Sequence, residues 1–457
     1  MDINSYQTYF FIGIGGTGMS AIAQYLKGIG KTVSGSDRQF TVNGITDTEI
    51  KLKKEGIPTF QQDGSGIDEK TEIIVVSTAV EENNPEYQKA NQLKIKIILR
   101  SDLLAAITRT KRTIAVSGTS GKSTTTAMIY HIMENIGQPI SFIGGAGLIS
   151  LQQLGKIGNA IAADSDWLVI EADESDGSLV KYRPEIGVIL NIDKDHKELV
   201  ELESIFDTFK KNIQGKLIVN QSHSRTKPFS QSMENDFGYE TECGFNATHF
   251  EQNGFQIRFQ INQVQFEIPC VGQHNMENAA AAVASCFQLG ISLEQASKAL
   301  KSYGGIYRRH QVIGKVNGAT IIDDYAHNPA KIAASIKACQ FDGSKLYVWF
   351  QPHGFQPTKF LRAEFVEEII KSLRKEDDIW MSEIYYAGGT VTKDISAKDL
   401  IDDIKIHHNN AYFIENRESL PEKIKSKIKN KDIVLLTGAR DSSLSDFAQL
   451  VYKRLNH

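Results

Sequence analysis

The sequence predicts an α/β protein of three domains, with Rossmann-like domains at both ends and a P-loop-type central domain on a mostly parallel sheet. The chain has 457 residues, which at the usual ~100–200 residues per domain suffices for about three domains. Apolar runs typical of buried parallel strands alternate with helix-like segments, and polar loops directly follow several of these runs. We place the domains at residues 1–107, 108–311 and 312–457.

The composition favours a soluble enzyme that acts on small molecules. Hydrophobic residues make up 41% and charged residues 23% of the chain, as in ordinary globular proteins, and no apolar stretch approaches the ~20 residues that span a bilayer. A net charge of −4 gives no electrostatic reason to expect a nucleic acid or a membrane as partner. The four cysteines are widely spaced and form no CxxC pair, which is typical of reduced, cytoplasmic thiols.

The N-terminal region begins with a strand-like run at residues 9–12, followed by a glycine-rich loop at 13–20 and a helix over about 19–29. Further strands are expected at 32–34 and 72–76. Taken alone, this glycine loop and Asp37 would indicate dinucleotide binding, as in a hydride-transfer enzyme.

The central region carries a shortened P-loop between a strand at 113–117 and a helix. Its backbone N–H groups can surround phosphates at the helix N-terminus, while Lys122 offsets their charge and the Ser123 hydroxyl can bind Mg²⁺. Val116 stands where the usual P-loop pattern has glycine. The alternative is a surface turn before a helix. The predicted phosphate-binding residues are Gly118, Thr119, Ser120, Gly121, Lys122, Ser123 and Thr124.

Two more strands of this region end in polar residues. The strand at 167–170 leads into an acidic run that contains Glu174, and the strand at 188–190 leads to His196. Ligands of doubly wound sheets bind at the carboxyl ends of the strands, so we expect these side chains beside Lys122. One or two carboxylates would suffice for Mg²⁺, although an acidic loop is more often simply solvated.

Weaker motifs follow. Asn275 and Asn278 open a helix and are either ligand contacts or caps. Arg308 and Arg309 suit bidentate phosphate binding or a surface salt bridge. Asp324 again follows a strand, at residues 319–322, and further strands are expected at 346–350 and 433–436.

The order of these motifs is more specific than any one of them. GTxGKS, ADES, NxxxDH, GxHNxxN, YRR and DDYAHxP together resemble the Mur ligase family, most closely its alanine-adding branch, from Gly13 to about Gly438. The N-terminal glycine loop, with residues 34–37 and 76–80, resembles the UDP-sugar domain of that branch. The UDP-sugar site that this resemblance implies comprises Gly15, Gly16, Thr17, Gly18, Ser36, Asp37, Ser77 and Thr78.

The resemblance implies an ADP-forming ligase of peptidoglycan synthesis. ATP would phosphorylate the carboxylate of UDP-N-acetylmuramate, and the amine of an amino acid, expected to be L-alanine, would then displace phosphate to form an amide. Lys122 would stabilise the transferred phosphoryl group. Ser123 and Glu174 would bind one Mg²⁺ and His196 a second.

The remaining roles also follow from the resemblance. Asn275 and Asn278 would contact adenine and Asp324 the ribose, while Arg308 or Arg309 would reach the phosphates. The amino-acid site would include Tyr325, His327 and His353. The protein would act as a monomer or homodimer.

Residues 352–358 read PHGFQPT where the family has PHRYxRT, so both arginines of that motif are absent. The identity of the amine substrate is therefore undecided. The alternative function is a murein-peptide recycling ligase or a paralogue that uses a different amine. A hydride-transfer enzyme would give Lys122 and Glu174 no function, which argues against that class. A non-catalytic sensor would not require both residues, and their presence therefore argues against a sensor as well.

Overall fold

The computed structural model describes residues 2–41, 45–193, 198–386 and 392–456. These residues form two compact units, each considered by itself below. The first comprises Met1–Glu251, Arg258–Pro269 and His274–Ile306; the second comprises Gln252–Ile257, Cys270–Gln273 and Tyr307–His457. Within the described residues, no helix is both long enough and apolar enough to cross a membrane.

The first sheet of the first unit is parallel, in the order β3-β2-β1-β4-β5. Its elements are η1 (Ile3–Ser5), β1 (Thr8–Ile12), α1 (Thr17–Gly28), β2 (Thr32–Ser36), α2 (Asp47–Lys54), β3 (Thr59–Phe60), β4 (Ile73–Val76), α3 (Pro85–Gln92), β5 (Lys96–Leu99) and α4 (Arg100–Thr108). Successive side chains of a strand point to opposite faces. Tyr9 and Phe11 therefore pack in the core with α1 and α4, while Phe10 and Ile12 pack in the core with α3.

The central sheet has the order β11-β10-β6-β9-β7-β8, and its described pairings are parallel except between β7 and β8. Its elements are β6 (Arg112–Ser117), α5 (Lys122–Asn135), β7 (Ser141–Ile143), α6 (Ile149–Gln153), β8 (Ala160–Ile161), β9 (Trp167–Glu171), η2 (Ser178–Lys181), β10 (Ile186–Ile189), α7 (Leu199–Asn212) and β11 (Lys216–Val219). Because β9 and β10 flank β6, the loops after these three strands meet at one edge.

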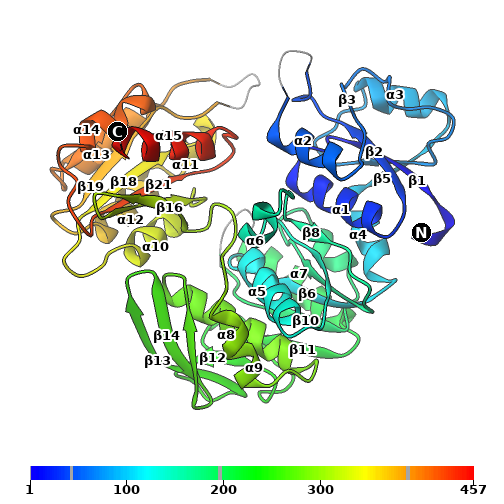
Figure 1. Cartoon of the computed structure of the whole chain (residues 1–457), viewed down its shortest axis with the longest axis horizontal. Helices are drawn as coiled ribbons and strands as arrows, with labels where there is room; N and C mark the ends of the chain where they lie inside the picture. Colours follow the sequence, from blue (N-terminus) through cyan, green and yellow to red (C-terminus); the bar gives the residue numbers. More distant parts are fainter. Residues whose placement is uncertain (1, 42–44, 194–197, 387–391, 457) are drawn as a thin grey trace. The chain divides into compact units, whose positions relative to one another are not determined.

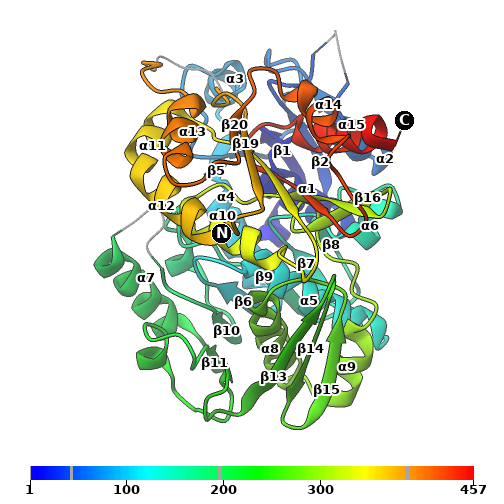
Figure 2. The ribbon, with the colours of Figure 1, turned by 90° about the vertical axis from the view of Figure 1, so that its left-hand side faces the viewer.

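A smaller four-stranded sheet, which the sequence analysis did not foresee, follows in the order β12-β13-β14-β15. Figures 1 and 2 both show α8 and α9 alongside this sheet. The elements of this segment are η3 (Lys227–Phe229), β12 (Phe237–Tyr239), β13 (Phe245–Asn253), β14 (Gln256–Ile261), β15 (Val264–Ile268), α8 (Gln273–Phe287) and α9 (Leu293–Leu300).

The sheet of the second unit has the order β16-β17-β21-β18-β19-β20 and is parallel except for the β16–β17 pair. One core packs α10, α12 and α13 on one face, and a second core packs α14 and α15 on the other. The elements are β16 (Gln311–Val316), β17 (Ala319–Asp324), α10 (Pro329–Ala338), β18 (Leu346–Gln351), α11 (Phe355–Phe360), α12 (Arg362–Ser372), β19 (Asp378–Met381), α13 (Ala397–Lys405), β20 (Ala411–Phe413), η4 (Arg417–Ser419), α14 (Leu420–Ile424), β21 (Ile433–Gly438) and α15 (Leu444–Asn456).

Candidate active site

The glycine loop of the central sheet lies between β6 and α5, as the sequence predicts. Gly121 is the N-cap residue of α5 and has a φ of +85°. A Cβ atom on Gly121 would lie 2.2 Å from Oδ1 of Asn278, so both the backbone conformation and the space require glycine here. The first N–H groups of a helix have no partner within the helix, and those of α5 therefore form a potential phosphate site.

Asn191, the second residue after β10, holds the loop in shape. Its Oδ1 accepts hydrogen bonds from the Thr119 hydroxyl at 2.9 Å and from the backbone N–H of Ser120 at 2.8 Å. Its Nδ2 donates to the Ser120 carbonyl at 3.1 Å. Asn191 was not among the residues predicted to form the site, although its position directly after a buried strand was the available signal.

Lys122 lies among acceptors at the start of α5. Its Nζ is 2.6 Å from the Gly118 carbonyl oxygen, 2.7 Å from Oε2 of Glu174 and 3.4 Å from Oδ1 of Asp173. Burial lowers the pKa of Lys122, but the carboxylates of Glu174, Asp173 and Glu171 outweigh burial, and the net pKa is raised. The ammonium group therefore stays charged at neutral pH.

A further carboxylate, Glu171, belongs to this cluster and was not singled out from the sequence. Its Oε2 accepts hydrogen bonds from the Ser123 hydroxyl and from the Gly145 backbone N–H, each at 2.8 Å. Thr124 is the third residue of the same helix, α5. The described residues include no group of three or more His, Cys, Asp and Glu side chains arranged as a metal site. His196 lies outside the described residues.

The hydroxyl and carboxylate oxygens near Ser123 nevertheless suit Mg²⁺, which needs only one or two protein carboxylates and keeps several waters. Ser123, Glu171 and Glu174 supply such oxygens at the carboxyl edge of the central sheet. The structure places Glu174 against Lys122 and Glu171 against Ser123, and the binding of Mg²⁺ by Ser123 and Glu174 stays a prediction.

Asn275 and Asn278 lie inside α8, which begins at Gln273, so neither is the N-cap residue of that helix. Both are buried. Oδ1 of Asn278 accepts from the Thr125 hydroxyl at 3.3 Å, and Nδ2 of Asn278 donates to Oδ1 of Asn275 at 3.2 Å. These asparagines therefore pack against the P-loop helix.

The glycine loop of the first sheet closes onto Asp37. The N–H of Gly15 donates to Oδ2 of Asp37 at 2.9 Å, and the N–H of Gln39 donates to Oδ1 at 3.0 Å. A Cβ on Gly15 would lie only 2.8 Å from Oδ2 of Asp37. Gly16 caps α1, Thr17 and Gly18 begin that helix, Ser36 ends β2, and Ser77 and Thr78 follow β4. All eight predicted UDP-sugar residues thus lie at the carboxyl edge of three adjacent strands, β2, β1 and β4.

In the second unit, the two adjacent arginines have different surroundings. Arg308 is 6% exposed; its Nε lies 3.1 Å from both carboxylate oxygens of Asp323, and its guanidinium donates to the Gly438 carbonyl at 2.9 Å. Arg309 is partly exposed, with its guanidinium carbon 4.8 Å from the ring centre of Tyr325. Arg308 is therefore held by the fold, whereas Arg309 is the arginine available to a ligand.

Asp324 is buried at the end of β17 and is bound by its own unit. Its Oδ1 accepts from the His310 N–H at 2.9 Å, and its Oδ2 accepts from the Ala326 N–H at 3.2 Å and from the Ser335 hydroxyl at 2.9 Å. Burial raises the pKa of Asp324, but the nearby charges of His310 and Arg309 and these hydrogen bonds give a net lowering. The contact of Asp324 with a ribose stays a prediction.

Tyr325, His327 and His353 lie together at the carboxyl edge of the second unit's sheet. The His327 ring centre is 5.4 Å from that of Tyr325 and 5.5 Å from that of His353. Burial lowers the pKa of both histidines to about 4, and the charge of Arg440 adds to the effect on His353. Both imidazoles are therefore neutral at pH 7, and Arg440, which the sequence analysis did not select, is a cation near them.

The lowered pKa values of His327 and His353 imply that the free energy of unfolding depends on pH. An unfolded imidazole has a pKa of 6.5, whereas these have pKa values of about 4, so protons bind preferentially to the unfolded chain as the pH falls from 6.5 to 4. We expect the free energy of unfolding to decrease through that range and the decrease to be smaller in a His327→Gln/His353→Gln variant. Denaturant titrations at pH 7, 5.5 and 4.5 would test this, and a pH-independent difference between the two proteins would contradict it.

A P-loop at the edge of a mostly parallel sheet, beside a cluster of carboxylates, defines a P-loop nucleotide-binding protein. Models of three domains match the chain in succession: Mur ligase family, catalytic domain, at residues 8–112; Mur ligase middle domain at 116–286; and Mur ligase, glutamate ligase domain, at 308–440. The chain belongs to the Mur ligase family. The α/β fold class and the family predicted from the sequence are confirmed.

Individual relatives are similar over nearly the whole chain. The UDP-N-acetylmuramate–L-alanine ligase of Geobacter sulfurreducens is 35% identical over 450 residues, which cover 94% of each chain. The ligase of the same name from Dictyoglomus turgidum is 34% identical and covers 94% of this chain and 93% of its own. The crystal structure of the UDP-N-acetylmuramate–alanine ligase from Thermotoga maritima shares the fold, with a TM-score of 0.82, 24% identity, and coverage of 98% of this chain and 99% of its own.

Proposed function

We propose that the chain is an ADP-forming ligase that joins L-alanine to the carboxylate of UDP-N-acetylmuramate, in peptidoglycan synthesis. The observation that carries this proposal is the identity of 35% over 94% of both chains to a ligase of that name. The P-loop, with Lys122 beside Glu174 and Ser123 beside Glu171, supports the same chemistry.

The residues of the central sheet fit ATP and Mg²⁺. The N-terminus of α5, which begins directly after Gly121, would receive the phosphates, Lys122 supplies a fixed positive charge, and Ser123 and Glu174 would supply oxygen ligands for the metal. ATP would supply the phosphoryl group that activates the substrate carboxylate, and Mg²⁺ would offset the charge of its phosphates. His196 stays our candidate for a second metal.

The main barrier to this reaction is the electrostatic repulsion between two anions, and Lys122 is positioned to reduce that repulsion. A phosphate and a carboxylate repel each other, and a fixed cation in a partly buried site offsets that repulsion without reorganisation. Lys122 is charged and held at the P-loop by Gly118 and Glu174. We therefore propose that Lys122 stabilises the transferred phosphoryl group. Asn275 and Asn278 are proposed to contact the adenine of ATP.

The other roles are assigned by unit. The loop of Gly15 and Gly16, with its companions at the edge of the first sheet, is proposed to bind the UDP-sugar. In the second unit we propose Arg309 for the phosphates, Asp324 for the ribose, and the group of Tyr325, His327 and His353 for the amino acid. We propose domains at 1–107, 108–311 and 312–457; a cytoplasmic location and a monomeric or homodimeric state remain predictions.

One observation favours a second candidate, a ligase for a peptide or another amine. Residues 354–358 read GFQPT, without the two arginines that the resemblance leads one to expect. The crystal structure of a murein peptide ligase from Psychrobacter arcticus also shares the fold, with a TM-score of 0.67, 20% identity, and coverage of 99% of both chains. The choice of amine therefore has to be measured.

The test is phosphate release from ATP by the purified protein with Mg²⁺ and UDP-N-acetylmuramate, comparing L-alanine, glycine, L-serine and the murein tripeptide. We expect release to require both the sugar acid and L-alanine, and mass spectrometry to detect the amide. Preference for the tripeptide would support the second candidate. Release that does not depend on UDP-N-acetylmuramate would contradict both.

A further inference from the structure

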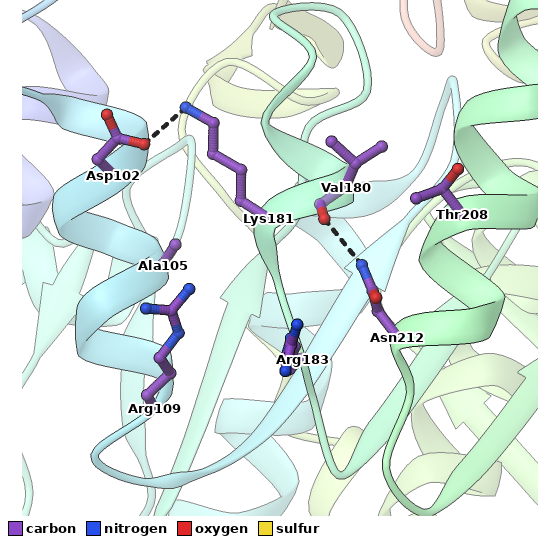
Figure 3. Close-up of a pocket in the computed structure, with 8 residues that line it drawn as sticks. All are labelled: Asp102, Ala105, Arg109, Val180, Lys181, Arg183, Thr208 and Asn212. Atoms are coloured by element: carbon purple, nitrogen blue, oxygen red, sulfur yellow. Dashed lines mark hydrogen bonds and ion pairs between the residues drawn. The ribbon is translucent and has the colours of Figure 1, made fainter. Parts of the chain in front are cut away.

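A groove of ≈ 580 Å³ lies in the first unit, away from the P-loop. It is bordered by α4, by η2 and the residues after it, and by α7 (Figure 3). Its polar lining residues are Asp102, Arg109, Lys181, Arg183, Thr208 and Asn212. Small-molecule sites usually have volumes of about 300–1,000 Å³, so the groove is large enough for a metabolite.

The charges in the groove are unbalanced. The lining contains three cationic side chains and one carboxylate, that of Asp102. This carboxylate forms an ion pair with Lys181, whose Nζ lies 2.7 Å from Oδ1 of Asp102. Figure 3 shows no interaction from the guanidinium of Arg109 or of Arg183 to the other residues drawn. Glu185, two residues after Arg183 in the sequence, pairs with Arg112 at 3.3 Å. Among the residues that the structure describes, neither guanidinium group has a carboxylate partner, so both can bind an anion from solution.

The position of the arginines separates this groove from the proposed active site. Arg109 precedes β6 and Arg183 precedes β10, two adjacent parallel strands. Both arginines therefore lie at the amino edge of the central sheet, whereas the P-loop follows β6 at the carboxyl edge. Six residues of strand separate the two edges by roughly 20 Å.

Guanidinium groups bind phosphate through paired N–H donors. The Thr208 hydroxyl on α7 donates to the Ser204 carbonyl at 3.0 Å, so the arginines supply the donors that the proposal needs. The Asn212 side chain donates to the Val180 carbonyl at 2.8 Å and so ties the end of α7 to η2. From the volume, the two uncompensated charges and this lining, we propose that the groove binds a phosphorylated small molecule at a site separate from the nucleotide and sugar sites.

Calorimetric titration of inorganic pyrophosphate tests the proposal. A Lys122→Ala background weakens binding at the P-loop, and in it we expect Arg109→Ala/Arg183→Ala to lower pyrophosphate affinity at least tenfold. Arg225→Ala/Arg258→Ala in the same background removes the same net charge from exposed positions of the first unit and should leave the affinity within about twofold. Arg109→Lys/Arg183→Lys should give an intermediate affinity, because the charge remains but the paired donors are lost.

If Lys122→Ala impairs folding, the same comparison is made in the Lys122 protein saturated with Mg²⁺ and ADP. Equal loss in the groove and control variants would reduce the effect to net charge and overturn the proposal. Equal affinity in all variants, or no binding of pyrophosphate at all, would overturn it too. None of these outcomes depends on ligase activity, so failure here is distinct from failure of the proposed function.

Discussion

Lys122→Ala is expected to lower kcat for ligation by at least about a hundredfold to a thousandfold, the size of effect seen when one preorganised stabilising donor is removed from an active site. Lys122 is the charged group at the start of α5, and its Nζ lies 2.7 Å from Glu174. The measurement is phosphate release under saturating ATP, UDP-N-acetylmuramate and amine.

The matched control is Lys111→Ala. Lys111 precedes the same strand, β6, at its other end, and its Nζ donates to the Ser165 carbonyl at 2.6 Å. This variant should keep nearly full activity. Lys122→Arg is informative as well, because it retains a positive charge in a different shape. Full activity of Lys122→Ala would remove the P-loop lysine from the mechanism.

Arg308→Ala is expected to destabilise the protein by about 3–5 kcal/mol, the usual cost of breaking a buried ion pair by removing one partner. The Asp323 carboxylate would lose the guanidinium that lies 3.1 Å away, while it is itself only 1% exposed. Denaturant titration at pH 8 measures the loss. Arg309→Ala should change stability little and instead lower activity, which separates the two neighbouring arginines.

The same pair predicts a dependence on pH. Burial raises the pKa of Asp323 to about 6 even though Arg308 lowers it, and removing Arg308 would raise that pKa further. A carboxyl whose folded pKa lies above its unfolded value gains relative stability as the pH falls, because the folded state then binds more protons. The stability difference between Arg308→Ala and the unchanged protein should therefore be smaller at pH 5 than at pH 8. An equal difference at both values would contradict the ion-pair explanation.

Local sequence patterns were sufficient to predict the two glycine loops, the family and the α/β class of this protein. A buried strand, a glycine loop and a helix start are all encoded within a few residues, so the P-loop at 118–124 and the loop at 13–20 were predictable in place and type. The order of motifs along the chain was enough to predict the family. The α/β class followed from alternating strand and helix patterns, which depend on neighbours in sequence.

Tertiary structure decided which side chains meet. Asn191 and Glu171 hold P-loop residues through contacts over 71 and 48 positions of sequence, a distance at which no local pattern specifies a partner. Arg308 and Arg309 are equivalent in sequence, yet only one of them is buried against Asp323. The groove of Arg109 and Arg183 exists only because β6 and β10 are adjacent in the sheet. Burial and strand order, which depend on the whole chain, made these distinctions.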